Sequence, residues 1–220
     1  MVAEAIITHW HHDHQGGVKH LQELSPDTII YKNQPSEGWL DIEDGQRFSV
    51  DGASLRAVFS PGHTQDHMAL VLEEEDAMFT GDNVLGHGTA VFEDLVVYLR
   101  SLEKMRGSFS GRAYPGHGAV IEDGPSKILE YIKHRQQRED QVIHVLRSLK
   151  STAGTNSPAK DCDEWTSMEI VKIIYKDVPE SLHLPANGGI LQILRKLKEE
   201  EKVIENTATE RWRIRDRATL

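Results

Sequence analysis

The chain has 220 residues and a formal net charge of −10, which argues against a generally basic nucleic-acid-binding surface but leaves room for a local basic patch. Its single cysteine, Cys162, excludes an internal disulfide framework and suggests a reducing compartment. No apolar run approaches the roughly 20 residues of a membrane helix, and the first residues lack the pattern of a signal peptide. We therefore expect a protein without membrane segments, built from one medium domain and one small domain.

The first motif directly follows a short apolar run, residues 5–7, that predicts a buried strand. Four possible metal ligands stand within six positions: His9, His11, Asp13 and His14. Imidazole and carboxylate groups are common ligands of zinc and iron. A solvated His-rich turn or an expression tag is the alternative, but Asp13 interrupts the run and Gly16-Gly17 follow it immediately. We interpret the motif as a metal site at the end of a strand.

The next elements are predicted from apolar spacing and turn residues. Val18, Leu21 and Leu24 have helical spacing before Ser25-Pro26, and residues 28–31 predict a second short strand. Residues 48–50 and 54–59 predict one hairpin, and residues 68–72 and 77–80 a second, with the acidic residues 73–76 as its solvated tip.

Two helical regions are predicted after the second hairpin. Thr89 is expected to be the N-cap of a helix whose apolar face carries Val91, Leu95, Leu99 and Leu102. Pro125 predicts the start of one long helix or of two abutting helices. The middle of this region, residues 134–141, is almost wholly polar and is expected to be exposed.

Three further candidate ligands stand at turns that follow predicted strands. They are His63 in Pro61-Gly62-His63-Thr64, Asp82 in Thr80-Gly81-Asp82, and His117 in Tyr114-Pro115-Gly116-His117-Gly118. Asp82 could cap a turn instead, but the repeated placement at strand ends favours a ligand. His67 could also be a ligand, although we interpret it as supporting structure. The glycine-rich loop 85–89, which contains His87, is only weak evidence for phosphate binding.

The C-terminal part differs in composition from the rest. Residues 151–163 are rich in Ser, Thr, Gly, Asn, Pro and Lys, so we interpret them as a linker between a domain at 1–150 and a module at 164–220. Helices at 167–175 and 187–201 and a hairpin at 203–204 and 211–214 are typical of a winged helix. The end of this module is positively charged, with Arg211, Arg213, Arg215 and Arg217. We interpret these arginines as part of a solvated wing, with an RNA contact through Arg211 and Arg213 as the alternative.

With these motifs in place, the chain resembles the metallo-β-lactamase superfamily. The resemblance rests on residues 8–14, Pro61-Gly62-His63-Thr64, Thr80-Gly81-Asp82 and Tyr114-Pro115-Gly116-His117-Gly118. It implies an α/β fold, the αββα metallo-β-lactamase sandwich, over residues 1–150, with the winged-helix-like module behind it. Residues 81–95, His134-Arg135 and residues 167–203 are similar to the β-lactamase-like protein 2 branch. That branch includes fungal lactamase-like thioesterases of polyketide biosynthesis and an animal mitochondrial endoribonuclease.

The family pattern also implies a ligand set and a mechanism. His9, His11 and His63 would hold one metal ion, Asp13, His14 and His117 the second, and Asp82 would bridge them. Two zinc ions are the first expectation, with manganese or iron as alternatives. On such metals the pKa of a bound water falls from about 16 to about 7, so a metal-bound hydroxide would be the nucleophile. Asp13 would be the catalytic carboxylate that carries a proton to the leaving group.

The resemblance leads us to expect a binuclear metallo-hydrolase. The leading hypothesis, from the resemblance to the fungal members, is a thioesterase that acts on an acyl or polyketide thioester of a carrier protein or of coenzyme A. A thiolate needs little protonation to leave, so the site suits thioesters, but this chemistry alone does not select them. Cleavage of single-stranded RNA, with the winged module as the grip, is the second hypothesis. The resemblance does not specify the acyl group or the oligomeric state.

The start of the chain carries one more expectation. Family members begin with a β region before the His motif, so the sandwich is expected to be N-terminally truncated, without one or two hairpins and with an exposed sheet edge. An inactive or binding-only fragment is therefore the third hypothesis. A cytoplasmic location is expected, with a mitochondrial one as the alternative.

Overall fold

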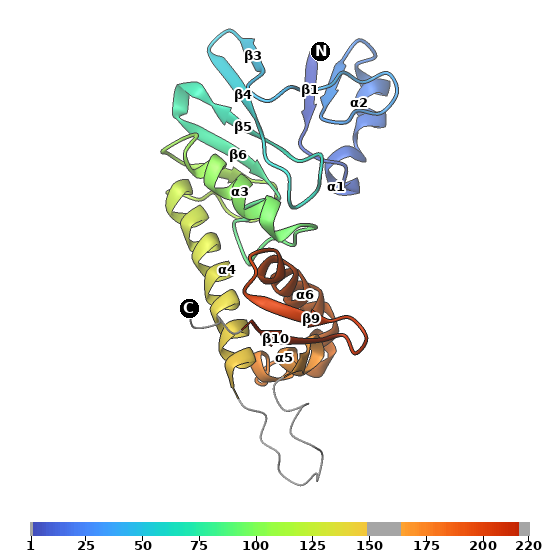
Figure 1. Cartoon of the computed structure of the whole chain (residues 1–220). Helices are drawn as coiled ribbons and strands as arrows, with labels where there is room; N and C mark the ends of the chain where they lie inside the picture. Colours follow the sequence, from blue (N-terminus) through green and yellow to red (C-terminus); the bar gives the residue numbers. More distant parts are fainter. Residues whose placement is uncertain (1, 149–163, 216–220) are drawn as a thin grey trace, which may run out of the picture. The chain divides into compact units, whose positions relative to one another are not determined.

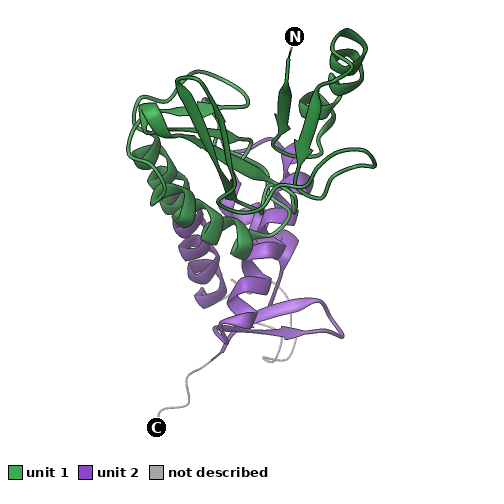
Figure 2. Cartoon of the chain, turned by 90° about the horizontal axis from the view of Figure 1, so that it is seen from above, with its two compact units in different colours: residues 1–133 green, residues 134–220 purple. Residues whose placement is uncertain are grey.

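The computed structural model describes residues 2–148 and 164–215, and the chain divides into two compact units, residues 1–133 and 134–220 (Figure 2). The division falls inside helix α4 (Gly124–Arg147). The predicted linker at 151–163, Cys162 and Arg217 lie outside the described residues, so the domain boundaries at 150 and 164 stay predictions. No helix within the described ranges has the length and apolar character needed to cross a bilayer.

Unit 1 contains two β-sheets (Figure 1). In the smaller sheet, β1 (Glu4–Ile7) runs parallel to β2 (Ile29–Lys32), with Glu4 opposite Ile29. The larger sheet has the order β3-β4-β5-β6-β7. Its strands are β3 (Arg47–Val50), β4 (Ala53–Phe59), β5 (Met68–Leu72), β6 (Ala77–Gly81) and β7 (Ala113–Pro115). The antiparallel pairings β3-β4 and β5-β6 confirm the two predicted hairpins.

The larger sheet buries apolar side chains on both faces. On one face, Val58 and Met78 pack in one cluster with Tyr98 of α3 (Leu95–Arg106) and Ile128 of α4. On the other face, Phe48, Ala57 and Met68 pack with Ile6 and Tyr31 of the smaller sheet. Behind the smaller sheet, Ile7 and Ile30 form a cluster with Val18 of α2 (Val18–Leu24). The order helix, sheet, sheet, helix is the predicted αββα arrangement.

Helix α3 corrects one prediction. It begins at Leu95, where the Asp94 carboxylate accepts a hydrogen bond of 2.9 Å from the backbone N–H of Val97. Thr89 is therefore not the N-cap, and Val91 is 77% exposed outside the helix. Asp is a slightly better N-cap residue than Thr, and a helix that begins after Asp94 has Leu95, Tyr98, Leu102 and Met105 on its buried face.

Unit 2 contains the winged-helix elements. Helices α5 (Ser167–Ile174) and α6 (His183–Glu199) are followed by the antiparallel pair β9 (Val203–Asn206) and β10 (Arg211–Ile214). The sequence missed β8 (Trp165–Thr166), which pairs with β10 and makes the sheet three-stranded, because two residues are too few to display an alternating pattern. Thr166 also forms a capping box with Glu169 at the start of α5.

The polar middle of α4 is not uniformly exposed. Glu139 is only 3% exposed, and Lys196 Nζ of α6 lies 2.6 Å from its Oε2 atom. Lys202 Nζ lies 3.6 Å from the other carboxylate oxygen. The expectation of an exposed segment at 134–141 is therefore wrong at this position, because the partner cations stand about 60 residues away and cannot be recognised from local composition.

Candidate metal centre

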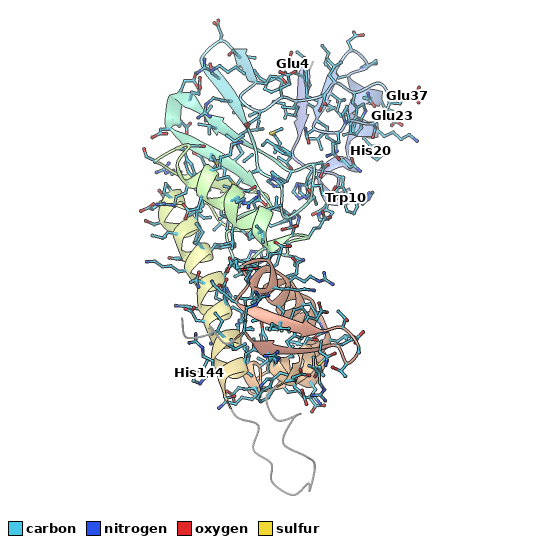
Figure 3. The ribbon with its side chains drawn as sticks, viewed as in Figure 1. Glu4, Trp10, His20, Glu23, Glu37 and His144 are labelled. Carbon is cyan, nitrogen blue, oxygen red and sulfur yellow. The ribbon has the colours of Figure 1, made fainter. Side chains whose placement is uncertain are left out.

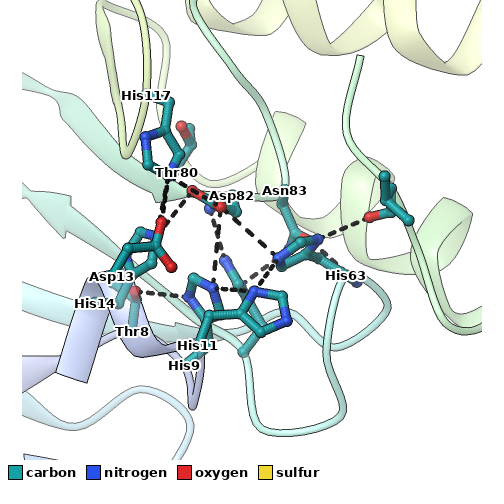
Figure 4. Close-up of polar contacts among 12 residues, drawn as sticks. Thr8, His9, His11, Asp13, His14, His63, Thr80, Asp82, Asn83 and His117 are labelled. Atoms are coloured by element: carbon teal, nitrogen blue, oxygen red, sulfur yellow. Dashed lines mark hydrogen bonds and ion pairs between the residues drawn. The ribbon is translucent and has the colours of Figure 1, made fainter. Parts of the chain in front are cut away.

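The fold brings all seven predicted ligand residues to one edge of unit 1 (Figure 4). Strands β4 and β6 both run antiparallel to β5, and β7 is parallel to β6, so the C-terminal ends of β4, β6 and β7 meet at the same edge. His63, Asp82 and His117 follow these ends. His9 and His11 follow β1, and Asp13 and His14 belong to the short helix α1 (His12–Gln15).

One group of donors consists of His9, His11, His63 and Asp82, whose ligand atoms lie within 4.8 Å of one another. His11 Nδ1 lies 3.1 Å from His9 Nε2 and 3.1 Å from His63 Nε2. His63 Nε2 lies 3.8 Å from Asp82 Oδ2. Three imidazole nitrogens and one carboxylate oxygen therefore converge, and this donor set suits a divalent transition metal.

The second group consists of Asp13, His14, Asp82 and His117. His14 Nε2 lies 3.3 Å from His117 Nε2, and His117 Nε2 lies 2.9 Å from Asp13 Oδ2. Asp82 belongs to both groups and is 8% exposed. Its Oδ1 atom, 3.3 Å from His14 Nε2, is buried and accepts no hydrogen bond within the described part of the chain. A buried carboxylate oxygen without a hydrogen-bond donor is what we expect of a metal ligand.

His67 lies in neither donor group and instead contacts the backbone of Asp82. Its Nε2 atom accepts a hydrogen bond of 3.1 Å from the backbone N–H of Asp82. An accepting Nε2 leaves the proton on Nδ1, which lies 2.9 Å from the Ser60 hydroxyl. Asn83 Nδ2 completes the network by donating to the Ser60 carbonyl oxygen over 2.6 Å. This geometry supports the interpretation of His67 as supporting structure.

The site favours neutral imidazoles and an ionised carboxylate. Burial, followed by the charges of His67, His14, His63 and His11, lowers the pKa of His9 to about 2. Burial also lowers the pKa of His63. Desolvation acts to raise the pKa of Asp13, but a backbone hydrogen bond and the charges of His14 and His117 lower it below its usual value. Neutral imidazole and ionised carboxylate are the forms that bind metals.

Sequence reasoning missed the parts of the site that support the ligands. The backbone carbonyl of Val91 lies 2.7 Å from His63 Nδ1 and fixes that ring, but a carbonyl leaves no signature in the sequence. Gly81 has φ +50°, and a Cβ atom there would lie 2.5 Å from His67 Nε2, so only glycine fits between strand β6 and Asp82. His12 and His87 belong to neither donor group.

Two known protein families match this chain, one in each unit. Residues 2–117 match the metallo-beta-lactamase superfamily, and residues 166–212 match the beta-lactamase associated winged helix domain. Solved structures agree. A beta-lactamase domain protein from Burkholderia ambifaria covers 97% of this chain and 74% of its own with a TM-score of 0.80 at 16% identity, which shows the fold alone. A metallo-beta-lactamase family protein from Thermus thermophilus covers 82% of this chain and 56% of its own, with a TM-score of 0.63 at 25% identity.

Three of the curated relatives are fungal proteins. Lactamase-like protein adaB of Aspergillus niger is 42% identical over 92% of this chain, which spans 64% of the length of adaB. Lactamase-like protein aptB of Emericella nidulans is 42% identical over 98% of this chain and 70% of its own length. An Aspergillus chevalieri protein named atrochrysone carboxyl ACP thioesterase is 47% identical over 92% of this chain and 65% of its own length. The chain therefore spans less than two thirds of adaB and of the Aspergillus chevalieri protein.

Proposed function

Because the chain belongs to the metallo-beta-lactamase superfamily, we propose that it is a binuclear metal-dependent hydrolase, and specifically a thioesterase that releases an acyl group from a carrier protein. The observation that carries the hydrolase assignment is the pair of donor groups that share Asp82. The choice of thioester is supported by the relative named as an ACP thioesterase, which is 47% identical. Polyketide biosynthesis is the setting we propose for it.

The side chains fit two divalent metal ions. His9, His11, His63 and Asp82 would hold one ion, and Asp13, His14, His117 and Asp82 the other. Nitrogen and oxygen donors without a thiolate suit zinc, with manganese and iron as alternatives. When bound, such ions supply Lewis acidity toward a carbonyl oxygen and lower the pKa of a water molecule to about 7.

Asp13 is the carboxylate we assign to proton transfer. Its side chain is 56% exposed, whereas that of Asp82 is 11% exposed, so Asp13 is the carboxylate that substrate and water can reach. Its lowered pKa keeps it ionised at neutral pH, ready to accept a proton and to pass it to the leaving group. A thiol has a pKa of about 8.5 and leaves as a thiolate with little assistance, so this site suits thioesters well.

No observation favours the RNA hypothesis. Arg211 Nη1 donates to the Glu164 carbonyl over 3.2 Å and lies 3.4 Å from Glu169 Oε2. Arg213 Nε lies 3.9 Å from a Glu164 carboxylate oxygen. Because carboxylates of the same unit face both arginines, the wing offers phosphates little uncompensated positive charge.

The test is thiol release from an acyl thioester, with the acyl group on a carrier protein and on N-acetylcysteamine. We expect hydrolysis that disappears on chelation and returns with zinc, manganese or iron. Asp82→Asn should reduce the bound metal from two equivalents to one or less and lower kcat at least about 100-fold. Asp27→Asn, an exposed carboxylate before β2, is the matched control and should leave both unchanged. Hydrolysis that resists chelation, or that Asp82→Asn leaves intact, would refute the proposal.

A further inference from the structure

The seven candidate metal ligands come from two different sheets of unit 1. Four of them follow β1 of the smaller sheet: His9, His11, Asp13 and His14. The other three follow strands of the larger sheet: His63, Asp82 and His117. Each donor group takes two residues from each sheet, and Asp82 serves in both groups. Both metal sites therefore depend on how the two sheets are held relative to one another.

The smaller sheet needs support at the edge that carries the metal centre. It has only two strands, and a lone pair of strands is marginally stable by itself. Its side chains Ile6 and Tyr31 pack on the larger sheet, but apolar attraction is not directional. A functional site requires its groups to be held within about 0.5 Å of the productive geometry. Directional polar contacts between the sheets would supply that precision.

Strand register places Lys32 at this edge. Strands β1 and β2 are parallel, and Lys32, the last residue of β2, lies opposite Ile7, the last residue of β1. Figure 3 shows Glu4 at one end of the smaller sheet and Trp10, which directly follows His9, at the other. Lys32 therefore ends its strand beside the segment that carries the first four ligands.

A buried ion pair joins Lys32 to the larger sheet. Its Nζ atom lies 2.5 Å from Oδ2 of Asp66, in the loop between β4 and β5, and the two residues are 4% and 3% exposed. Asp66 follows the candidate ligand His63 by three residues and directly precedes His67. The pair therefore links the end of β2 to the loop that carries one ligand and the histidine that contacts the backbone of Asp82.

The ammonium group of Lys32 is fixed to its own side of the contact. Its Nζ atom donates to the carbonyls of Asn33 and Gln34 over 2.9 and 3.1 Å. Gln34 has φ +53°, which is unfavourable for a non-glycine residue, and its backbone N–H donates to Asp41 Oδ1 over 3.1 Å. Because these bonds fix the turn after β2, the positive charge has little freedom to move and holds Asp66 in one place.

Stability alone does not account for this pair. Both carboxylate oxygens of Asp66 are buried, and neither accepts a hydrogen bond of good geometry within the described part of the chain. The attraction between Lys32 and Asp66 is therefore mainly one between charges, and it must offset the lost hydration of both groups. A neutral pair of similar shape is often as stable as a buried ion pair. What the neutral pair lacks is the attraction that fixes two elements at one distance.

A backbone hydrogen bond joins the two sheets close to the ion pair. The N–H of Met68, the first residue of β5, donates to the carbonyl of Thr8 over 2.8 Å. Thr8 directly precedes His9, and its hydroxyl lies 3.0 Å from His9 Nδ1. Because Met68 stands two residues after Asp66, this bond breaks when the sheets move apart at the metal-binding edge.

We propose that the Lys32–Asp66 pair is an inter-sheet clamp, and that its two residues are positioning residues that hold the two halves of the metal centre in register. The role in metal binding rests on the proposed binuclear function, whereas the clamp rests on the contacts between the sheets. Neither residue belongs to a donor group. Loss of the clamp weakens both metal sites, since each takes ligands from both sheets.

The test is the paired substitution Lys32→Met with Asp66→Asn, which removes both charges and leaves no buried charge unpaired. We expect a folded protein whose zinc affinity, measured by chelator competition, falls about 10-fold or more at both sites. The matched control is Lys127→Met with Glu130→Gln, which removes an ion pair of 2.7 Å within helix α4 and should leave both affinities unchanged. Unchanged zinc affinity in the clamp variant, or a loss confined to one site, would overturn the proposal.

Hydrogen exchange tests the clamp in the metal-free protein. The N–H of Met68 should exchange at least about 10-fold faster in the paired variant, because the sheets separate more often at this edge. The N–H of Met78, which donates to the Arg112 carbonyl over 2.9 Å where β6 pairs with β7, is the internal control and should keep its rate. An unchanged Met68 rate, or equal acceleration of both amides, would overturn the clamp.

The two measurements separate the clamp from the proposed function. If the unmodified chain binds no metal, the proposed function fails, and the exchange of the Met68 amide judges the clamp. If the paired variant does not fold, Asp66→Asn takes its place, because Lys32 then keeps both carbonyl partners. The same losses are expected of this variant. A folded Asp66→Asn protein with unchanged zinc affinity and an unchanged Met68 rate would overturn the proposal.

Discussion

The Nε2 atom of His67 accepts a hydrogen bond of 3.1 Å from the backbone N–H of Asp82, and both residues are buried. This bond orients the segment that carries the carboxylate shared by the two donor groups. His67→Ala should therefore weaken metal binding about 10- to 100-fold, as is usual when a residue that orients a metal ligand is lost. Competition with a chelator of known affinity measures the effect.

His67→Gln is the conservative control, because its side-chain carbonyl can again accept a hydrogen bond. It should recover part of the lost affinity if His67 acts by positioning Asp82. Unchanged metal affinity in a folded His67→Ala protein would show that the backbone of Asp82 is held by the strand alone.

Asp13 lies 2.9 Å from His117 Nε2 and is the exposed carboxylate of the site. If it carries a proton to the leaving group, Asp13→Ala should slow an oxygen ester more than a thioester with the same acyl group, because an alkoxide needs protonation and a thiolate hardly does. We expect the ester to lose about 10-fold more in kcat than the thioester. Parallel losses on both substrates, at full metal content, would assign Asp13 to metal binding alone.

The candidate site could be predicted more completely than the fold around it. His9, His11, His63, Asp82 and His117 stand in short motifs at strand ends, so sequence spacing was sufficient to bring them together as candidates. The Val91 carbonyl behind His63 could not be predicted, because it depends on a loop conformation.

The fold itself shows why tertiary contacts escape local patterns. The N-cap was misplaced from Asp94 to Thr89 because both residue types cap helices, and only packing of Tyr98 and Leu102 into the core decides between them. Glu139 was predicted to be exposed to solvent. Its ion-pair partners, Lys196 and Lys202, lie far away in the sequence, so the local composition does not reveal them. Of the two strands that pair with β10, β9 was predicted. Strand β8 was not, since it has only two residues.

The buried Glu139–Lys196 pair should matter for the stability of unit 2. Lys196→Met leaves Glu139, 3% exposed, with Lys202 at 3.6 Å as its remaining ion-pair partner among the described residues. Breaking a buried pair from one side costs about 3–5 kcal/mol, which urea unfolding followed by circular dichroism can resolve. The matched control is Lys198→Met, whose partner Glu205 lies 2.6 Å away but whose side chain is 50% exposed, so it should cost below about 1 kcal/mol. Equal costs for the two variants would contradict the structural role of Glu139.

The histidines of the site predict how the stability of the metal-free protein depends on pH. Burial lowers the pKa of His67 to about 3, and burial with neighbouring charges lowers that of His9 to about 2, from an ordinary value of 6.5. Below pH 6.5 the unfolded chain binds protons at these residues while the folded chain does not, so the free energy of unfolding falls as the pH falls. Above pH 6.5 both states are neutral and this contribution is constant.

For each such histidine the loss approaches about 1.4 kcal/mol per pH unit once the pH is well below 6.5, until the folded protein itself takes up the proton. Urea unfolding of chelated protein between pH 8 and 4 tests this slope. His67→Gln removes one of these titrating groups, so its stability should depend less steeply on pH than that of the unmodified chain. A slope that is the same in both proteins would mean that His67 is already protonated in the folded state.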